Sequence, residues 1–232
     1  MKEQLIELFG EIWYERLKDY LSTKEFLNIA QQVSLIRKSK TVYPSADRIF
    51  RIFKELPFDK VRVVMLAMDP YHDGSASGRA FDNSEAFHPS PSLKNIHKEI
   101  EMEYPELTDR FIMPFGGMDK WDLGYLVQQG VFLYNSALTV EKGKAGSHLK
   151  LWEPFTARVI QELNKSTHLA WLLLGRDAQK FKPSLNPKHK IIEAPHPASE
   201  SYSGGTSGFF GSGVFRRINF ALEEYGQNEI QW

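Results

Sequence analysis

The chain has 232 residues, of which 42% are hydrophobic and 13% aromatic, enough for one full core and for a single domain that spans 1–232. Its 29 lysines and arginines are balanced by 29 aspartates and glutamates, which argues against a protein that coats nucleic acid through a basic excess but leaves room for a local basic face. The absence of cysteine excludes disulfides, thiolate nucleophiles and cysteine-ligated zinc or iron–sulfur centres.

The N-terminal segment, residues 1–40, has the three- and four-residue apolar spacing of helices. Gly10 and the Ser-Thr pair that begins at Ser22 are placed to divide it into shorter helices. We expect this helical segment to pack on the rest of the domain. Ser45 is suited to cap a further helix that runs to about Glu55.

Four short apolar runs follow at wide intervals, and each has the length of a strand buried on both faces. These runs are 61–66, 131–134, 170–174 and 190–194. Helical patterns accompany them at 92–104, 120–129, 152–164 and 176–181. Alternating strands and helices predict an α/β fold, a single domain whose central four-stranded parallel sheet is flanked by helices on both faces.

No apolar run approaches the length that spans a membrane, and the N-terminus lacks the apolar core and cleavage site of a secretory signal. Together with the missing cysteines, these features fit a reducing compartment. We therefore expect a cytoplasmic monomer with no membrane partner.

Polar residues stand at the carboxyl end of each predicted strand, and ligands of open parallel sheets bind at that edge. The residues in question are Asp69, Tyr71 and His72 after the first run, Asn135 after the second, Gly175 and Arg176 after the third, and His196 after the fourth. Asp69, His72 and Asp73 could also ligate a metal, but the Pro-Tyr pair between them favours the wall of an organic pocket. We expect no metal and no cofactor.

These side chains suit a planar heterocycle. The Asn135 amide can donate and accept along a base edge, and Phe81 can stack on a ring. Asp69 can orient a water or balance a developing cation, while neutral His196 can donate a hydrogen bond to a developing oxyanion. This combination serves cleavage of a bond between a sugar and a base.

From about Tyr43 to Phe220 the chain resembles family 1 of the uracil-DNA glycosylases. The stretches that carry the likeness are 63–72, with its Asp-Pro-Tyr-His, 91–96, 129–140, 147–148, 175–180 and 196–211. Several motifs in the family's order and with compatible spacing make the likeness specific.

The resemblance implies a role for each matched position. Asp69 would activate water and stabilise the oxocarbenium sugar, and His196 would stabilise charge on uracil O2. The substrate-binding residues would be Met68 through its backbone, Tyr71 against the C5 methyl of thymine, Phe81 by stacking, and Asn135 by reading the uracil edge. The residues in contact with DNA would be Pro91, Ser92, His148, Gly175, Arg176, Ser199 and Tyr202.

The resemblance also implies that the protein releases uracil from single- or double-stranded DNA by base flipping and leaves an abasic site. A bacterial, viral or phage source fits, and a nuclear location stays open. A protein inhibitor or replication proteins are the expected protein partners. Two other functions stay open: a glycosylase-fold scaffold on DNA with weak or no catalysis, and a hydrolase of free nucleosides.

The chain departs from the family pattern at several places, which include a stretch from Tyr71 to Phe81 that is about one residue shorter than usual. Ala67-Met68 stands where Gly-Gln is usual, and Arg176 replaces a small serine. Direct counting puts Glu200 where the family has a leucine wedge that fills the space left by the flipped base. An acid is a poor wedge in a base stack, and the nearby Tyr202 could stack into the gap instead, so which of the two is the wedge stays open, as does the alternative that Tyr202 is only an exposed side chain.

Overall fold

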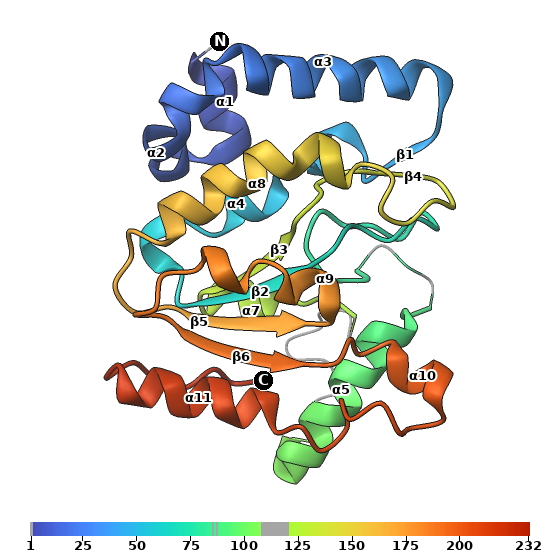
Figure 1. The fold of residues 1–232 in the computed structure, drawn as a ribbon, viewed down its shortest axis with the longest axis vertical. Helices are drawn as coiled ribbons and strands as arrows, with labels where there is room; N and C mark the ends of the chain where they lie inside the picture. Colours follow the sequence, from blue (N-terminus) through green and yellow to red (C-terminus); the bar gives the residue numbers. More distant parts are fainter. Residues whose placement is uncertain (1, 85, 87, 108–120) are drawn as a thin grey trace.

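The computed structural model describes residues 2–84, 86, 88–107 and 121–232. Its central sheet has four parallel strands in the order β3-β2-β5-β6. Their bounds are Val63–Ala67 for β2, Val131–Asn135 for β3, Ala170–Leu174 for β5 and Lys190–Ala194 for β6. Helices cover both faces of this sheet, with α4 (Arg51–Glu55) and α8 (Leu149–Leu163) on one side and α5 (Pro91–Glu103) and α11 (Val214–Glu224) on the other (Figure 1). The predicted fold class is confirmed.

Burial on both faces explains why apolar and polar residues do not alternate along the strands. All residues of β2, β3 and β5 are buried, as expected for strands covered on both faces. The same expectation is wrong for β6, which exposes Lys190 and leaves Ile191 and Glu193 only half-buried. Edge position alone does not explain this, because β3 lies at the other edge of the sheet and is buried throughout.

The longer helices follow the predicted spacing with small shifts at their ends. They are α5 (Pro91–Glu103), α8 (Leu149–Leu163) and α11 (Val214–Glu224). The shorter ones are α4 (Arg51–Glu55), α7 (Gly124–Gln128), α9 (Arg176–Gln179) and α10 (Ser199–Ser203). The predicted helix at 120–129 is thus reduced to α7, and its first residue lies outside the described residues. Short 3₁₀ turns lie at Phe58–Lys60, Pro105–Leu107 and Lys182–Ser184.

The N-terminal segment forms three helices, α1 (Lys2–Phe9), α2 (Glu11–Leu21) and α3 (Lys24–Ser39). They are separated at Gly10 and at Ser22-Thr23, as the sequence predicts. Trp13 on α2 is fully buried, donates its indole N–H to the Leu56 carbonyl over 2.8 Å, and stacks on Phe132 of β3. The segment therefore contributes directly to the core beside the sheet.

The region from Ser45 to Glu55 differs from the prediction. A 3₁₀ turn at Ala46–Arg48 is followed by the separate helix α4, and the Ser45 side chain makes no capping hydrogen bond. The preceding residues form β1 (Val42–Tyr43), which pairs in antiparallel fashion with β4 (Val140–Glu141). This pairing joins segments far apart in the sequence, so local patterns did not indicate it. Within the described ranges, no helix is long and apolar enough to cross a membrane.

Candidate active site

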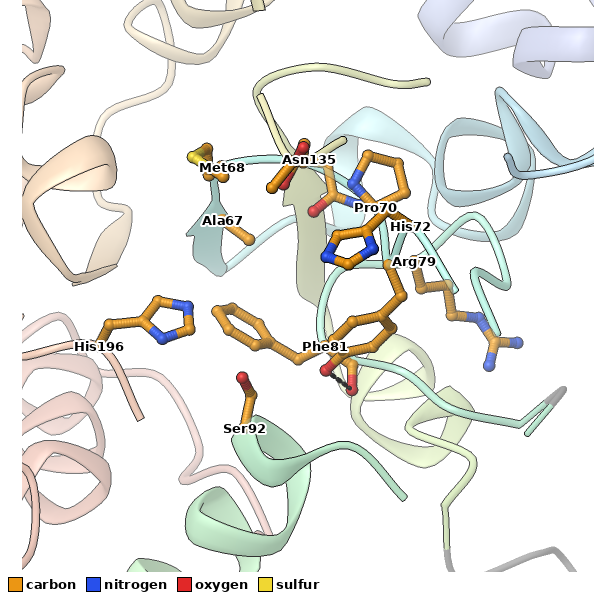
Figure 2. A pocket seen from close by; sticks show the side chains of 12 residues that line it. Ala67, Met68, Pro70, His72, Arg79, Phe81, Ser92, Asn135 and His196 are labelled. Carbon is orange, nitrogen blue, oxygen red and sulfur yellow. Dashed lines mark hydrogen bonds between the residues drawn. The ribbon is translucent and has the colours of Figure 1, made fainter. Parts of the chain in front are cut away.

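The carboxyl ends of the strands enclose a cavity of about 180 Å³. Figure 2 shows Asn135, Phe81 and His196 arranged around it, with Ser92 at the start of α5 on the opposite side. The complete lining consists of Ala67, Met68, Asp69, Pro70, Tyr71, His72, Arg79, Phe81, Ser92, Asn135, Ala145 and His196. All six residues predicted to perform catalysis or bind the base therefore lie together in one cavity.

Asp69 stands two residues beyond the end of β2. Its Oδ2 accepts a hydrogen bond of 2.5 Å from the backbone N–H of Gly146, in the loop that follows β4. Burial raises the pKa of the Asp69 carboxyl above its ordinary value, and the Gly146 hydrogen bond offsets this only in part. A carboxylate in this environment is a stronger base than one in water.

His196 follows β6 and is positioned by a close approach to Gly175. A Cβ on Gly175 would lie 2.8 Å from the His196 Cβ, so only glycine leaves room for the ring. The backbone N–H of Ala198 donates to His196 Nδ1 over 3.2 Å, which leaves the proton of a neutral ring on Nε2. Burial lowers the pKa of His196, although Asp177 opposes the shift. The ring is therefore a neutral Nε2–H donor at neutral pH.

Asn135 ends β3 directly opposite Ala67 of β2. The two strand ends are joined further by a 2.7 Å hydrogen bond from the Ser136 hydroxyl to the Met68 carbonyl. The Asn135 side chain is buried, yet its Oδ1 accepts no hydrogen bond from the described residues. A buried polar atom without a partner is costly, so this oxygen is suited to accept a donor from a ligand in the cavity.

Tyr71 forms a fixed wall between the Asp69 segment and Phe81. Its hydroxyl donates to the Phe81 carbonyl over 3.2 Å and accepts from the Ser90 hydroxyl over 2.6 Å. Burial raises the pKa of Tyr71, so the hydroxyl stays a neutral donor. Sequence reasoning missed Ser90, although its place just before the Pro91 that opens α5 marks it as a helix cap.

Phe81 has a φ angle of 62°, a backbone conformation that a bulky residue rarely adopts. Its ring centroid lies 6.0 Å from that of His196, so the two rings line the same cavity. On either side of Phe81, buried Arg79 and Asp82 form an ion pair at 3.5 Å, and Arg79 also reaches Asp122 at 2.5 Å. This charged network holds the strained segment, and sequence reasoning missed it.

A wider groove of about 610 Å³ adjoins the cavity at His196. Gly175, exposed Arg176 and Ser199 line it, and these are three of the predicted DNA contacts. Exposed Pro91 begins α5, next to Ser92 in the cavity wall.

Two predicted DNA contacts, His148 and Tyr202, line neither the cavity nor the groove. His148 is only 3% exposed, and its Nδ1 forms a 2.8 Å hydrogen bond with the Thr139 hydroxyl, so it lies beneath the surface. The Ser199 hydroxyl already donates to the His196 carbonyl over 2.5 Å and would have to turn to bind phosphate. Tyr202, by contrast, is 84% exposed. The DNA roles of all these residues stay predictions.

The charged side chains of the site do not assemble into a metal centre in the part of the chain that the structure describes, where no three His, Asp or Glu side chains are grouped closely enough to hold an ion. Asp69 instead takes its hydrogen bond from a backbone N–H. Asp73 accepts hydrogen bonds from the N–H and hydroxyl of Ser75 at 2.9 and 2.7 Å. Each of these carboxylates thus has a partner from the protein itself.

Comparison with known proteins matches this fold and site to one family. The model of the uracil DNA glycosylase superfamily matches residues 53–220, which include every residue that lines the cavity. The chain therefore belongs to the uracil-DNA glycosylase superfamily.

Individual relatives agree over nearly the whole length. A uracil-DNA glycosylase of Actinobacillus succinogenes is 41% identical over 95% of this chain and 96% of its own. One from Streptococcus thermophilus is 39% identical over 95% of this chain and 97% of its own. The crystal structure of mimivirus uracil-DNA glycosylase superposes with a TM-score of 0.83 at 25% identity, covering 98% of this chain and 88% of that one.

Proposed function

We propose that the cavity beneath Asn135 is where this enzyme binds a flipped uracil and cuts its bond to the sugar. The chain is a uracil-DNA glycosylase, a hydrolase of the N-glycosidic bond that acts in DNA repair. The observation that carries the assignment of the site is the unpartnered Asn135 Oδ1, buried in the same cavity as Asp69 and His196.

Asn135 supplies the selectivity for uracil over cytosine. Its Oδ1 accepts the N3–H of uracil, and its side-chain amide donates to O4. Cytosine presents an acceptor at N3 and a donor at N4, so both contacts become mismatched in a buried site. Unpaired polar groups in a buried site reject the wrong ligand strongly.

Asp69 acts on the sugar and His196 acts on the uracil as the bond between them breaks. As the bond lengthens, the sugar gains positive charge, which the Asp69 carboxylate stabilises, and the same carboxylate accepts a proton from the attacking water. The uracil leaves with negative charge on O2, and the Nε2–H of His196 donates a hydrogen bond to it. Phe81 stacks on the base, while Tyr71 occupies the space that the C5 methyl of thymine would need.

DNA enters along the groove beside His196, and the target nucleotide rotates out of the helix to reach the cavity. The exposed guanidinium of Arg176, which lines this groove, is suited to a phosphate. Two further solved structures, both of mimivirus UNG variants, are complexes with UGI, which supports a protein inhibitor as a further partner of this chain. We also propose a cytoplasmic location and a monomeric state.

The first test is excision by the purified chain from labelled oligonucleotides that carry one uracil or one thymine, single- or double-stranded, in the presence of a chelator. Abasic sites that arise from uracil alone are expected with both strand types. The control is Asn135→Ala, which keeps the cavity but removes the reading amide and is expected to lose most of the activity.

The same assay separates the alternatives. No excision combined with retained DNA binding would favour the scaffold function. Release of uracil from free deoxyuridine at a rate similar to that from DNA would favour a nucleoside hydrolase. An Asn135→Ala variant as active as the parent would overturn the assignment of the cavity.

A further inference from the structure

The loop after His196 is organised by a buried carboxylate. Glu200, which direct counting places at the wedge position, is only 3% exposed. Its Oε1 accepts the backbone N–H groups of Phe209 at 2.6 Å and Phe210 at 2.9 Å, and its Oε2 accepts that of Ser207 at 3.2 Å. Glu200 is therefore not available as the wedge, because its side chain is buried and points into the loop.

These hydrogen bonds close a loop of about ten residues onto one side chain. Burial disfavours the ionised carboxyl of Glu200, but its hydrogen bonds with the loop outweigh this and lower its pKa. The side chain is therefore an anion at neutral pH, and hydrogen bonds to an anion are stronger than neutral ones. A further bond from the Gly205 N–H to the Glu200 carbonyl, at 3.0 Å, tightens the same loop.

Helix α5 fastens this loop to the catalytic cavity. Asn95 donates from its side-chain amide to the Pro197 carbonyl at 2.8 Å and to the Ser201 hydroxyl at 3.0 Å. One turn further along α5, buried Glu99 accepts the N–H groups of Gly211 at 2.7 Å and Gly213 at 3.0 Å. The helix whose first turn lines the cavity thus holds both ends of the loop (Figure 1).

The geometry of α10 determines where Tyr202 points. Residues two apart on a helix differ in direction by about 200°, so a buried Glu200 turns Tyr202 to the opposite side. Tyr202 is 84% exposed, the largest exposure among the exposed large hydrophobic residues described in the structure. An aromatic ring held outward on α10, the helix that begins three residues after His196, is suited to stack in a gap between bases.

We propose that Glu200 is a positioning residue for duplex DNA, which fixes the 200–210 loop so that Tyr202 fills the space left by the flipped nucleotide. The inference rests on the proposed function and adds to it a requirement specific to the duplex. A single strand has no base stack to hold open, so its cleavage does not depend on this wedge.

The test compares single-turnover excision rates from duplex and single-stranded substrate for the parent, Glu200→Ala, Tyr202→Ala and the double variant. We expect each single change to lower the duplex rate about ten- to a hundredfold, as expected for loss of one stacking contact, and to leave the single-strand rate within about twofold. The double variant should be no slower than Tyr202→Ala, because Glu200 acts through the tyrosine.

Matched controls distinguish positioning from a general loss of structure. Glu223→Ala removes an exposed acid from α11 and should leave both rates unchanged. Glu200→Gln keeps an oxygen that can accept from Phe209 and Phe210, so its duplex rate should lie between those of Glu200→Ala and the parent. Tyr202→Phe keeps the aromatic ring, so its duplex rate should equal that of the parent. Thermal unfolding of each variant shows whether the fold is retained.

Several outcomes would overturn the inference. An unchanged ratio of duplex to single-strand rates in Glu200→Ala is one. An equal loss on both substrates is another, because it would mean that Glu200 supports His196 and not Tyr202. Additive effects in the double variant are a third. Failure of the parent to excise uracil from either substrate would instead overturn the proposed site, so the two failures are distinguishable.

Discussion

The backbone N–H of Gly146 and Oδ2 of Asp69 are joined by a hydrogen bond of 2.5 Å between the end of β2 and the loop after β4. Gly146 has a φ angle of 74°, so a side chain there would strain the backbone that presents this donor. The other carboxylate oxygen, Oδ1, accepts no hydrogen bond from the described residues and is available to a water. The Gly146 hydrogen bond to Oδ2 therefore orients the Asp69 carboxylate, and Oδ1 is left to accept a proton from the attacking water.

Asp69→Asn tests this division. Asparagine can keep the Gly146 hydrogen bond through its oxygen, but it then presents an NH₂ group that cannot take a proton from water. We expect the single-turnover rate to fall about 10²- to 10⁴-fold, the usual contribution of a general base, with the melting temperature nearly unchanged. Asp73→Asn, a change to an exposed acid in the same segment, is the control and should stay close to the parent. A near-parental rate for Asp69→Asn would contradict the assignment.

The pH dependence of the reaction follows from the same two catalytic groups. Burial raises the pKa of Asp69 and lowers that of His196, and activity needs the first ionised and the second neutral. Activity should therefore fall as the pH drops through the raised pKa of Asp69, while His196 remains neutral at pH 7 and above. The single-turnover rate measured as the pH is lowered tests this fall in activity. The residual activity of Asp69→Asn should not show the fall, because asparagine does not ionise. An identical fall in that variant would assign it to another group.

Tyr71→Ala should admit thymine. The ring of Tyr71 is held at both sides of its hydroxyl, by the Phe81 carbonyl and by Ser90, so it cannot swing away from a methyl group. Overpacking against such a wall costs ~1–3 kcal/mol, so its removal should raise the ratio of thymine to uracil excision about 10- to 100-fold. Tyr71→Phe keeps the wall without the hydroxyl and serves as the control. Competition between labelled thymine and uracil substrates gives the ratio, and an unchanged ratio in Tyr71→Ala would refute the steric role.

The sequence predicted the site well where local order determines it. Asp69 and His196 follow parallel strands and Asn135 ends one, and the carboxyl ends of such strands must meet at one edge. Glu200 could not be placed in this way, because its partners lie seven to ten residues later and are backbone N–H groups, which no residue pattern reveals. The contact between Ser90 and Tyr71 depends likewise on how two loops fold against each other.

The ion network around Arg79 should control both stability and substrate binding. Arg79 is 8% exposed and pairs with Glu55 at 2.6 Å, as well as with Asp82 and Asp122. Arg79→Leu leaves Asp82 buried without a cation, a type of loss that costs ~3–5 kcal/mol. We expect urea unfolding to show a loss of this order and KM to rise, because the adjacent Phe81 ring loses its support.

A second substitution distinguishes the two effects of Arg79. Asp82→Asn in the Arg79→Leu background removes the uncompensated charge and should recover part of the stability. It should not restore KM, because the clamp on the Phe81 segment is still missing. Unchanged stability and KM in Arg79→Leu would show that the network has no such role.

The buried Glu103 carboxyl on α5 should make stability depend on pH. Burial raises the pKa of Glu103 to about 7, hydrogen bonds from Arg216 and Phe215 oppose this, and Glu99 raises it further. A carboxyl whose folded pKa is raised contributes stability that is fully present below its unfolded pKa of 4.5 and is lost as the pH rises to about 7. We therefore expect the melting temperature to fall between pH 5 and pH 8 by several degrees more in the parent than in Glu103→Gln, which stays neutral. Calorimetry at the two pH values measures the difference, and Glu101→Gln, on the same helix, is the control. Parallel curves for the parent and Glu103→Gln would show that this carboxyl does not change its charge in the range.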